Sequence, residues 1–122
     1  MSQSPEINDL GQLLRDMAGR VVKRVEADLK GLEWQHILLD VRYRKNGSSW
    51  ISKIRVSTQE RGLVSVRMSN EIDLLLITLN SLRCVLKDVW YGLKMEIDHT
   101  QQCQTTMDYN PDCSADKSFY DA

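Results

Sequence analysis

The segment WQHILLDVRYRKNGSSWISKIRVST, residues 34–58, decides the fold of this chain. In its first half apolar residues recur at every second position, which is the period of a β-strand. A second alternating stretch follows Asn46-Gly47, and this dipeptide is a strong signal for a tight hairpin turn. The segment therefore predicts two antiparallel strands that share one apolar face, formed by Ile37, Leu39, Val41, Tyr43, Trp50, Ile54 and Val56.

Three further strands are predicted outside this hairpin. A turn at residues 60–62 leads into a third alternating stretch over residues 64–68. Apolar and charged residues alternate again over residues 93–98, and a weaker fifth strand covers residues 103–109. Because no helix separates the strands within either group, we expect the sheet to be antiparallel.

The first of two amphipathic helices precedes the hairpin. Its apolar residues recur at spacings of three and four from Leu10 to Leu29. Asn8 or Asp9 is the expected N-cap, and Gly31 is a natural C-terminal stop. Residues 1–7 are therefore expected to form a loose leader.

The second helix is expected to begin after an N-cap at Ser69 or Asn70 and to end before residues 90–92. Leu74 and Ile77 widen its apolar stripe, so we expect this helix to be the more buried of the two. Cys84 falls within the same pattern and is expected to be a small buried side chain.

The order helix, three strands, helix, two strands predicts a two-layer α+β domain. Five antiparallel strands would form the sheet, and both helices would cover one of its faces. The 122 residues suit a single domain, spanning 1–122, with a sizeable core. Residues 108–122 stand out as an acidic, aromatic C-terminal segment.

Composition points to a soluble protein. Hydrophobic residues make up 42% of the chain and charged residues 27%, and the longest apolar run, residues 74–77, is far below the ~20 residues of a membrane helix. Residues 1–6 lack the pattern of a signal peptide, so we expect a cytoplasmic location and no membrane partner. His99, Cys103 and Cys113 lack metal-ligand spacing, and no cofactor motif is present, so no metal or cofactor is expected.

The charges are unevenly distributed along the chain. Residues 1–67 carry 12 Lys and Arg against 8 Asp and Glu, whereas residues 68–122 carry 4 against 9. The two halves therefore differ by nine charges, +4 against −5. This asymmetry predicts either a polarised surface or, if the halves interleave in the fold, a field that largely cancels.

Catalytic signals are poor. His36 is expected on a polar strand face and His99 in a turn, and neither has a nucleophile beside it in the sequence. Glu96 and Asp98 lie ~7 Å apart on one strand face, a spacing that suits acid–base work but is also that of ordinary solvated positions. We therefore expect a protein that is not an enzyme.

A nucleic-acid-binding or adaptor function is the alternative. Basic residues are expected on the open sheet face, where they could contact phosphates. Carboxylates share that face, and exposed aromatic residues are not interleaved with the basic positions as in RNA-binding sheets. A salt-bridged solvent face is therefore favoured over a nucleic-acid site; its basic members are Arg42, Arg44, Lys45, Lys53, Arg55 and Arg67.

The C-terminal segment DYNPDCSADKSFYDA, residues 108–122, combines four carboxylates with three aromatic rings. The stretch from Tyr109 to Asp121 resembles the closing signature of the YezG-type immunity proteins, which are antitoxins of bacterial polymorphic toxins. The upstream order also matches this family, with a Trp-initiated strand, a charged hairpin and Trp90 before a two-strand finish. Close sequence similarity is confined to residues 107–121.

The resemblance implies a protein that binds one cognate toxin domain, a nuclease, and blocks its active site or an adjacent surface. Carboxylates and rings would complement a basic, substrate-binding cleft. Tyr109 and Pro111 also fit a structural turn that closes the last strand. The expected toxin-binding residues are Asp108, Asp112, Asp116, Phe119, Tyr120 and Asp121, together with Glu96 and Asp98.

Overall fold

A computed structural model describes residues 5–44, 49–85 and 89–111 of the chain. The elements follow the predicted α-β-β-β-α-β-β order, and the predicted α+β class is confirmed. Their bounds are α1 (Pro5–Asp28), β1 (Trp34–Tyr43), β2 (Trp50–Thr58), β3 (Gly62–Val66), α2 (Asn70–Val85), β4 (Gly92–Asp98) and β5 (Cys103–Asp108).

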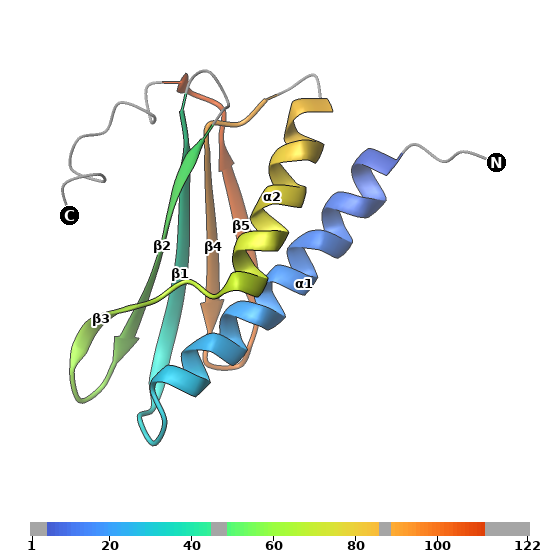
Figure 1. Ribbon diagram of the computed structural model, residues 1–122. Helices are drawn as coiled ribbons and strands as arrows, with labels where there is room; N and C mark the ends of the chain where they lie inside the picture. The colour runs from blue at the N-terminus through green and yellow to red at the C-terminus, as the bar shows by residue number, and fades with distance from the viewer. Residues whose placement is uncertain (1–4, 45–48, 86–88, 112–122) are drawn as a thin grey trace.

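The five strands form one antiparallel sheet in the order β3-β2-β1-β4-β5. The first three strands make a meander, and β4 then pairs with the opposite side of β1. Both helices lie against the same face of this sheet, so the molecule has two layers (Figure 1). The long hairpin predicted from residues 34–58 therefore supplies β1 and β2, with β3 added beside β2, β4 beside β1, and β5 beside β4.

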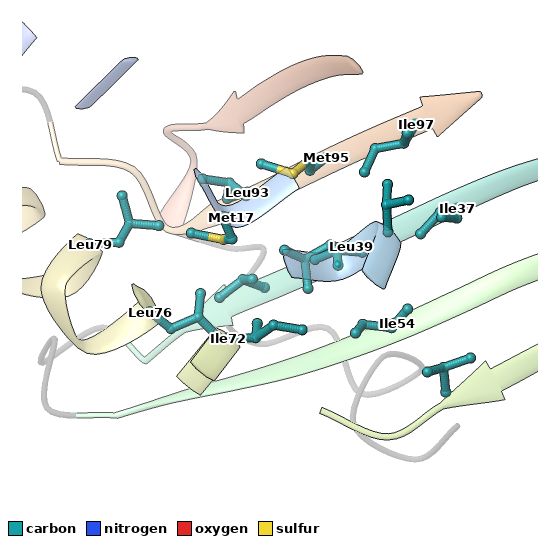
Figure 2. Packing of buried hydrophobic residues seen from close by; sticks show 14 of the residues in the cluster. Met17, Ile37, Leu39, Ile54, Ile72, Leu76, Leu79, Leu93, Met95 and Ile97 are labelled. Carbon is teal, nitrogen blue, oxygen red and sulfur yellow. The ribbon is translucent and has the colours of Figure 1, made fainter. Parts of the chain in front are cut away.

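The core lies between the sheet and the helices. Apolar residues at alternate positions of β1, β2 and β4 face the helices, where they are buried. Figure 2 shows these strand residues meeting side chains of both helices in one continuous cluster. Its fully buried members include Met17, Ile37, Leu39, Ile54, Ile72, Leu76, Leu79, Leu93 and Met95.

The first helix is longer at its start and shorter at its end than the sequence predicts. It begins at Pro5, so residues 5–7 do not belong to a loose leader, and neither Asn8 nor Asp9 is the N-cap. Proline suits the first turn of a helix because its missing N–H has no partner there in any case. The helix ends at Asp28, and a turn with Gly31 at φ +81° leads into β1.

The second helix has the predicted N-cap but not the predicted burial. The Ser69 hydroxyl accepts a hydrogen bond from the Ile72 amide at 3.2 Å, which satisfies one of the free amides of the first turn. Leu74 and Ile77 are 63% and 52% exposed, so the expectation of a more deeply buried helix was wrong at these positions. Cys84 is also exposed, contrary to prediction.

The geometry of the helix explains this result. Four residues spaced by four, three and four positions form the buried stripe, namely Ile72, Leu76, Leu79 and Arg83. Residues two or five positions from this stripe point away from the sheet, whatever their hydrophobicity. Arg83 is only 2% exposed, so it lies in the core at a position where the apolar pattern of the helix did not predict a buried residue.

Two strand boundaries also differ from prediction. The third strand covers Gly62–Val66 rather than residues 64–68, because the turn before it is tighter than expected. Gly62 has φ +66°, and the Thr58 hydroxyl accepts a hydrogen bond from the Arg61 amide.

In the described part of the chain, neither helix combines the length and apolar character needed to cross a membrane.

Candidate partner-binding surface

The face of the sheet that the helices leave uncovered carries the polar strand residues predicted to lie there. The register places them in rows that cross the strands. One row contains Lys53, Asp40, Lys94 and Thr106, and a second contains Arg55, Leu38, Glu96 and Gln104. We call this surface the open face.

Charge changes from one side of the open face to the other. Lys53 and Arg55 are the charged residues of β2, and this strand has no acidic residue. The acidic residues of β4 and β5 lie on the opposite side, because β1 separates β2 from β4. The sheet order therefore gives a polarised surface, because the β4–β5 side carries three carboxylates, at Glu96, Asp98 and Asp108, against one base, Lys94.

The centre of the open face is neutralised by local pairing. Asp40 accepts a hydrogen bond from Arg42 Nε at 3.1 Å, and these side chains are 15% and 13% exposed. Lys53 and Lys94 flank Asp40 on the two neighbouring strands. Opposite charges in such cross-strand positions stabilise the sheet and weaken its attraction for phosphate.

The aromatic residues of the strands do not form a stacking platform on this face. Tyr43 is buried in the core, and Trp34 and Trp50 pack against the core cluster on the helix side. Single-stranded nucleic acids are held by bases stacked on exposed rings. The strands thus present charges without such rings.

An acidic corner lies where β4 turns into β5, and we define it by His36, Glu96 and Asp98. Asp98 is the cross-strand neighbour of His36, while Glu96 lies two residues earlier on the same face of β4. These three residues line a hollow of about 410 Å³, with Gln102, Cys103 and Gln104 on its other side. The corner therefore brings together two of the predicted toxin-binding residues.

Asp98 also organises the turn between β4 and β5. Its Oδ1 atom accepts hydrogen bonds from the Thr100 hydroxyl at 2.6 Å and from the amides of Thr100 and Gln102 at 3.0 Å. These bonds, with that of the Thr100 hydroxyl foremost, hold the pKa of Asp98 below its ordinary value of 3.8. The carboxylate is therefore charged at neutral pH and is fixed in position by the turn.

Asp108 lies at the other end of the same two strands. It is the cross-strand neighbour of Gly92, whereas Asp98 follows six residues later on β4, ~20 Å away along the strand. A second hollow, of about 250 Å³, lies beside Asp108 and is also lined by Arg42, Thr106 and Tyr109. Within one chain, the acidic corner and Asp108 are thus separate sites.

The C-terminal residues expected to bind the toxin divide at the end of the described chain. Tyr109 is 53% exposed and its hydroxyl lies 3.8 Å from the Met107 sulfur, so it does not enter the core. Asp108 Oδ1 accepts a hydrogen bond from the Asn110 amide at 2.9 Å, a local turn of the kind expected before Pro111. The other predicted members, Asp112, Asp116, Phe119, Tyr120 and Asp121, lie outside the described residues.

Among the described residues, those weighed for catalysis and metal binding do not form a centre larger than the acidic corner. In the described ranges, no group of three or more His, Cys, Asp and Glu residues has an arrangement that could hold a metal ion. His99 is exposed in the turn after β4. Cys113 lies outside the described residues.

A groove on the helix side of β5 was not anticipated from the sequence. It has a volume of about 370 Å³ and runs between α1 and the strand, with Cys103 and Thr105 on its floor. The available signal was the weakness of the fifth apolar pattern, because small and polar residues leave a helix-facing surface incompletely filled. Its α1 wall contains Leu14, Arg15, Ala18, Gly19 and Val22.

No protein-family model matches the chain, and no curated protein sequence matches it.

Proposed function

We propose that the protein is a non-catalytic immunity protein that binds one cognate bacterial toxin domain in the cytoplasm and neutralises it. The observation that carries this proposal is the polarised open face, where Glu96, Asp98 and Asp108 occupy the β4–β5 side. The sequence continues from this side into the acidic, aromatic C-terminal segment that resembles the YezG-type immunity proteins.

A nuclease is the toxin class that this surface fits best. Enzymes that degrade nucleic acid bind phosphates through basic clefts. Carboxylates gathered on one side of a sheet attract such a cleft over several ångströms and raise the rate of encounter. Binding at or beside the cleft would exclude the substrate from the active site.

The first test is protection from the toxin domain encoded beside this gene. Cells that express this domain should survive when the chain is co-expressed and die when it is omitted. Equal killing in both cases would refute the proposal. Binding to nucleic acid is tested separately by a mobility shift, and tight binding at moderate salt would favour the alternative function.

The second test concerns the surface. The double variant Glu96→Lys with Asp108→Lys should slow association with the toxin about tenfold at low salt, and the difference should shrink as salt is added. Asp16→Lys with Glu60→Lys is the matched control, because it makes the same change in net charge at exposed positions on α1 and in the turn before β3. If both double variants slow association equally, the binding surface lies elsewhere.

A further inference from the structure

The strand β5 forms one edge of the sheet, and its backbone geometry shows which groups face outward. The Asp98 amide donates to the Gln102 carbonyl at 3.0 Å, so the Asp98 amide points at β5 and the Gln102 carbonyl points back at β4. Hydrogen-bonded pairs alternate with non-hydrogen-bonded pairs along antiparallel strands, so Gln104 and Thr106 point their backbone groups at β4. The Asp108 carbonyl also points toward β4, because it accepts a hydrogen bond at 2.7 Å from the amide of Tyr91, the residue before its register partner Gly92.

It follows that Cys103, Thr105 and Met107 direct their amides and carbonyls to the free edge. These groups have no partner strand among the described residues, since β5 is the last strand in the sheet order. A row of alternating donors and acceptors of this kind is a template for another strand.

The two edges of the sheet are protected to different degrees. The opposite edge strand, β3, has five residues and lies between Arg61 and Arg67. Residues 103–107 of β5 are uncharged, as are all five residues of β3, and neither strand contains a proline or a bulge in its register. Charges, prolines and bulges are the devices by which proteins keep edge strands from pairing. The two edges differ in the charges at their ends: Arg61 and Arg67 border β3 on both sides, whereas β5 follows the uncharged Gln102 and carries one charged residue, Asp108, at its end.

We propose that β5 pairs with β5 of a second copy of the chain, in an antiparallel register centred on Thr105. The two five-stranded sheets would then form one continuous sheet. In this register Thr105 faces its own counterpart, and Cys103 faces Met107 of the second copy. Every outward amide and carbonyl of these three residues thereby finds a partner.

Other registers use fewer of these groups. A shift of one residue places Thr105 opposite Thr106, whose backbone groups already point to β4. Centring the pairing on Gln104 or Thr106 leaves one of the three outward-facing residues opposite a position beyond the strand. The register centred on Thr105 is thus the one that the strand's own hydrogen-bonding pattern selects.

Side chains are compatible with this pairing. The threonines at the centre form a favourable cross-strand pair. Asp108 faces Gln102 of the second copy, so no two like charges stand directly opposite each other. The two-fold axis keeps all four helices on one side of the joined sheet, where the grooves between α1 and β5 meet over the junction.

The pairing also changes the acidic surface. In the dimer, Asp108 of one copy lies in the same cross-strand row as Gln102 and Asp98 of the other. The carboxylates of Asp108 and of Asp98 in the second copy are then two strand spacings, or about 10 Å, apart. The acidic corner and Asp108, ~20 Å apart within one chain, would thus be combined across the junction. The dimer itself does not depend on the proposed function.

Light scattering on the purified full chain tests the proposal directly. The parent should have the mass of a dimer, and Thr105→Pro should halve it. Proline is tolerated where the amide faces away from the sheet, so the variant should keep the parent's circular dichroism spectrum. Leu74→Glu is the control for association through the exposed side of α2 and should leave the dimer intact.

A cross-linking experiment tests the register without relying on proline. In a background of Cys84→Ser, Cys103→Ser and Cys113→Ser, Thr105→Cys should give a disulfide-linked dimer on mild oxidation, because directly opposed residues are about 5.5 Å apart at Cα. Thr106→Cys in the same background should give none. A monomeric parent, a dimer lost only with Leu74→Glu, or equal cross-linking at both positions would overturn the proposal.

Discussion

The guanidinium carbon of Arg83 lies 4.4 Å from the centre of the Tyr43 ring, and both side chains are buried. The same guanidinium lies 5.4 Å from the ring centre of Tyr91, and its Nε atom donates to the Trp90 carbonyl. A desolvated cation–π contact contributes roughly 2 kcal/mol, and a hydrogen bond from a charged donor contributes a similar amount. Arg83 therefore ties the end of α2 to the end of β1 and to the chain entering β4.

Replacement of Arg83 by alanine should lower the free energy of unfolding by about 3 kcal/mol, because it leaves a cavity and removes the donor to the Trp90 carbonyl. Arg83→Met should lower it less, because methionine fills much of the volume and removes the buried charge. Urea unfolding followed by circular dichroism measures both changes. An alanine variant as stable as the parent would show that Arg83 does not hold these elements together.

Two leucines on α2 provide a matched test of the packing. Leu76 is fully buried and Leu74 is 63% exposed, although they are two residues apart. We expect Leu76→Ala to destabilise the protein by about 3 kcal/mol and Leu74→Ala by less than about 0.5 kcal/mol. Urea unfolding of both variants checks the orientation of the helix, and equal losses would contradict it.

Tyr43 should make the protein sensitive to alkaline pH. Burial is the main cause that raises the pKa of Tyr43 to about 12, and the positive charge of Arg83 acts in the opposite direction. In the unfolded chain the Tyr43 hydroxyl loses its proton near pH 10, whereas in the folded protein it keeps this proton until about pH 12. The folded state therefore has its full stability below pH 10 and loses stability as the pH rises toward 12. The loss should reach about 1 kcal/mol by pH 11.

Comparison with Tyr43→Phe isolates this effect. The phenylalanine variant has no proton to lose at this position, so its free energy of unfolding should fall less between about pH 9 and pH 11 than that of the parent. These two pH values lie about one unit below and above the ordinary pKa of tyrosine. Urea midpoints measured at both pH values provide the comparison. Parallel losses in the two proteins would show that Tyr43 is not the group responsible.

Asp98 should contribute to stability at neutral pH and lose this contribution in acid. Its pKa is lower in the folded protein than its ordinary value of 3.8, so the contribution is complete above pH 3.8 and is lost as the pH falls through the folded pKa. Asp98→Asn should therefore unfold at lower urea than the parent at neutral pH. The difference should narrow as the pH falls below 3.8.

Thr100→Val tests the cause of the lowered pKa of Asp98. This substitution removes the hydroxyl that donates to Asp98 Oδ1 and leaves the carboxylate in place. The pKa of Asp98, measured by NMR titration, should move upward toward its ordinary value. An unchanged pKa would assign the effect to the backbone amides instead.

Much of the fold follows from local patterns in the sequence. The alternation around Asn46-Gly47 predicts a hairpin, and the spacing of three and four predicts two helices, because these periods reflect the geometry of single elements. Ser69 or Asn70 was the predicted N-cap of the second helix, and Ser69 has that role. The ends of helices and strands were predicted less well, because several neighbouring residues have the chemistry of a cap or a turn and the sequence does not show which of them is used.

The candidate surface was predictable only in part. Alternation placed Glu96 and Asp98 on the face away from the core, but it did not indicate that Asp98 accepts three hydrogen bonds within a turn. The pattern of α2 likewise did not reveal the burial of Arg83, because an arginine in an amphipathic helix is normally expected to face solvent. Both roles depend on groups brought close by the chain's folding.

By itself, the sequence determined the kind and order of the elements and which strand face is apolar, because these depend on residues close together in the chain. Only the tertiary structure decided that β4 pairs with β1 and that β5 is an edge. Strand order is set by pairing between distant segments, and that pairing separates the basic strand β2 from the acidic residues of β4 and β5. The polarised face and the open edge are therefore properties of the fold, even though every charge in them is visible in the sequence.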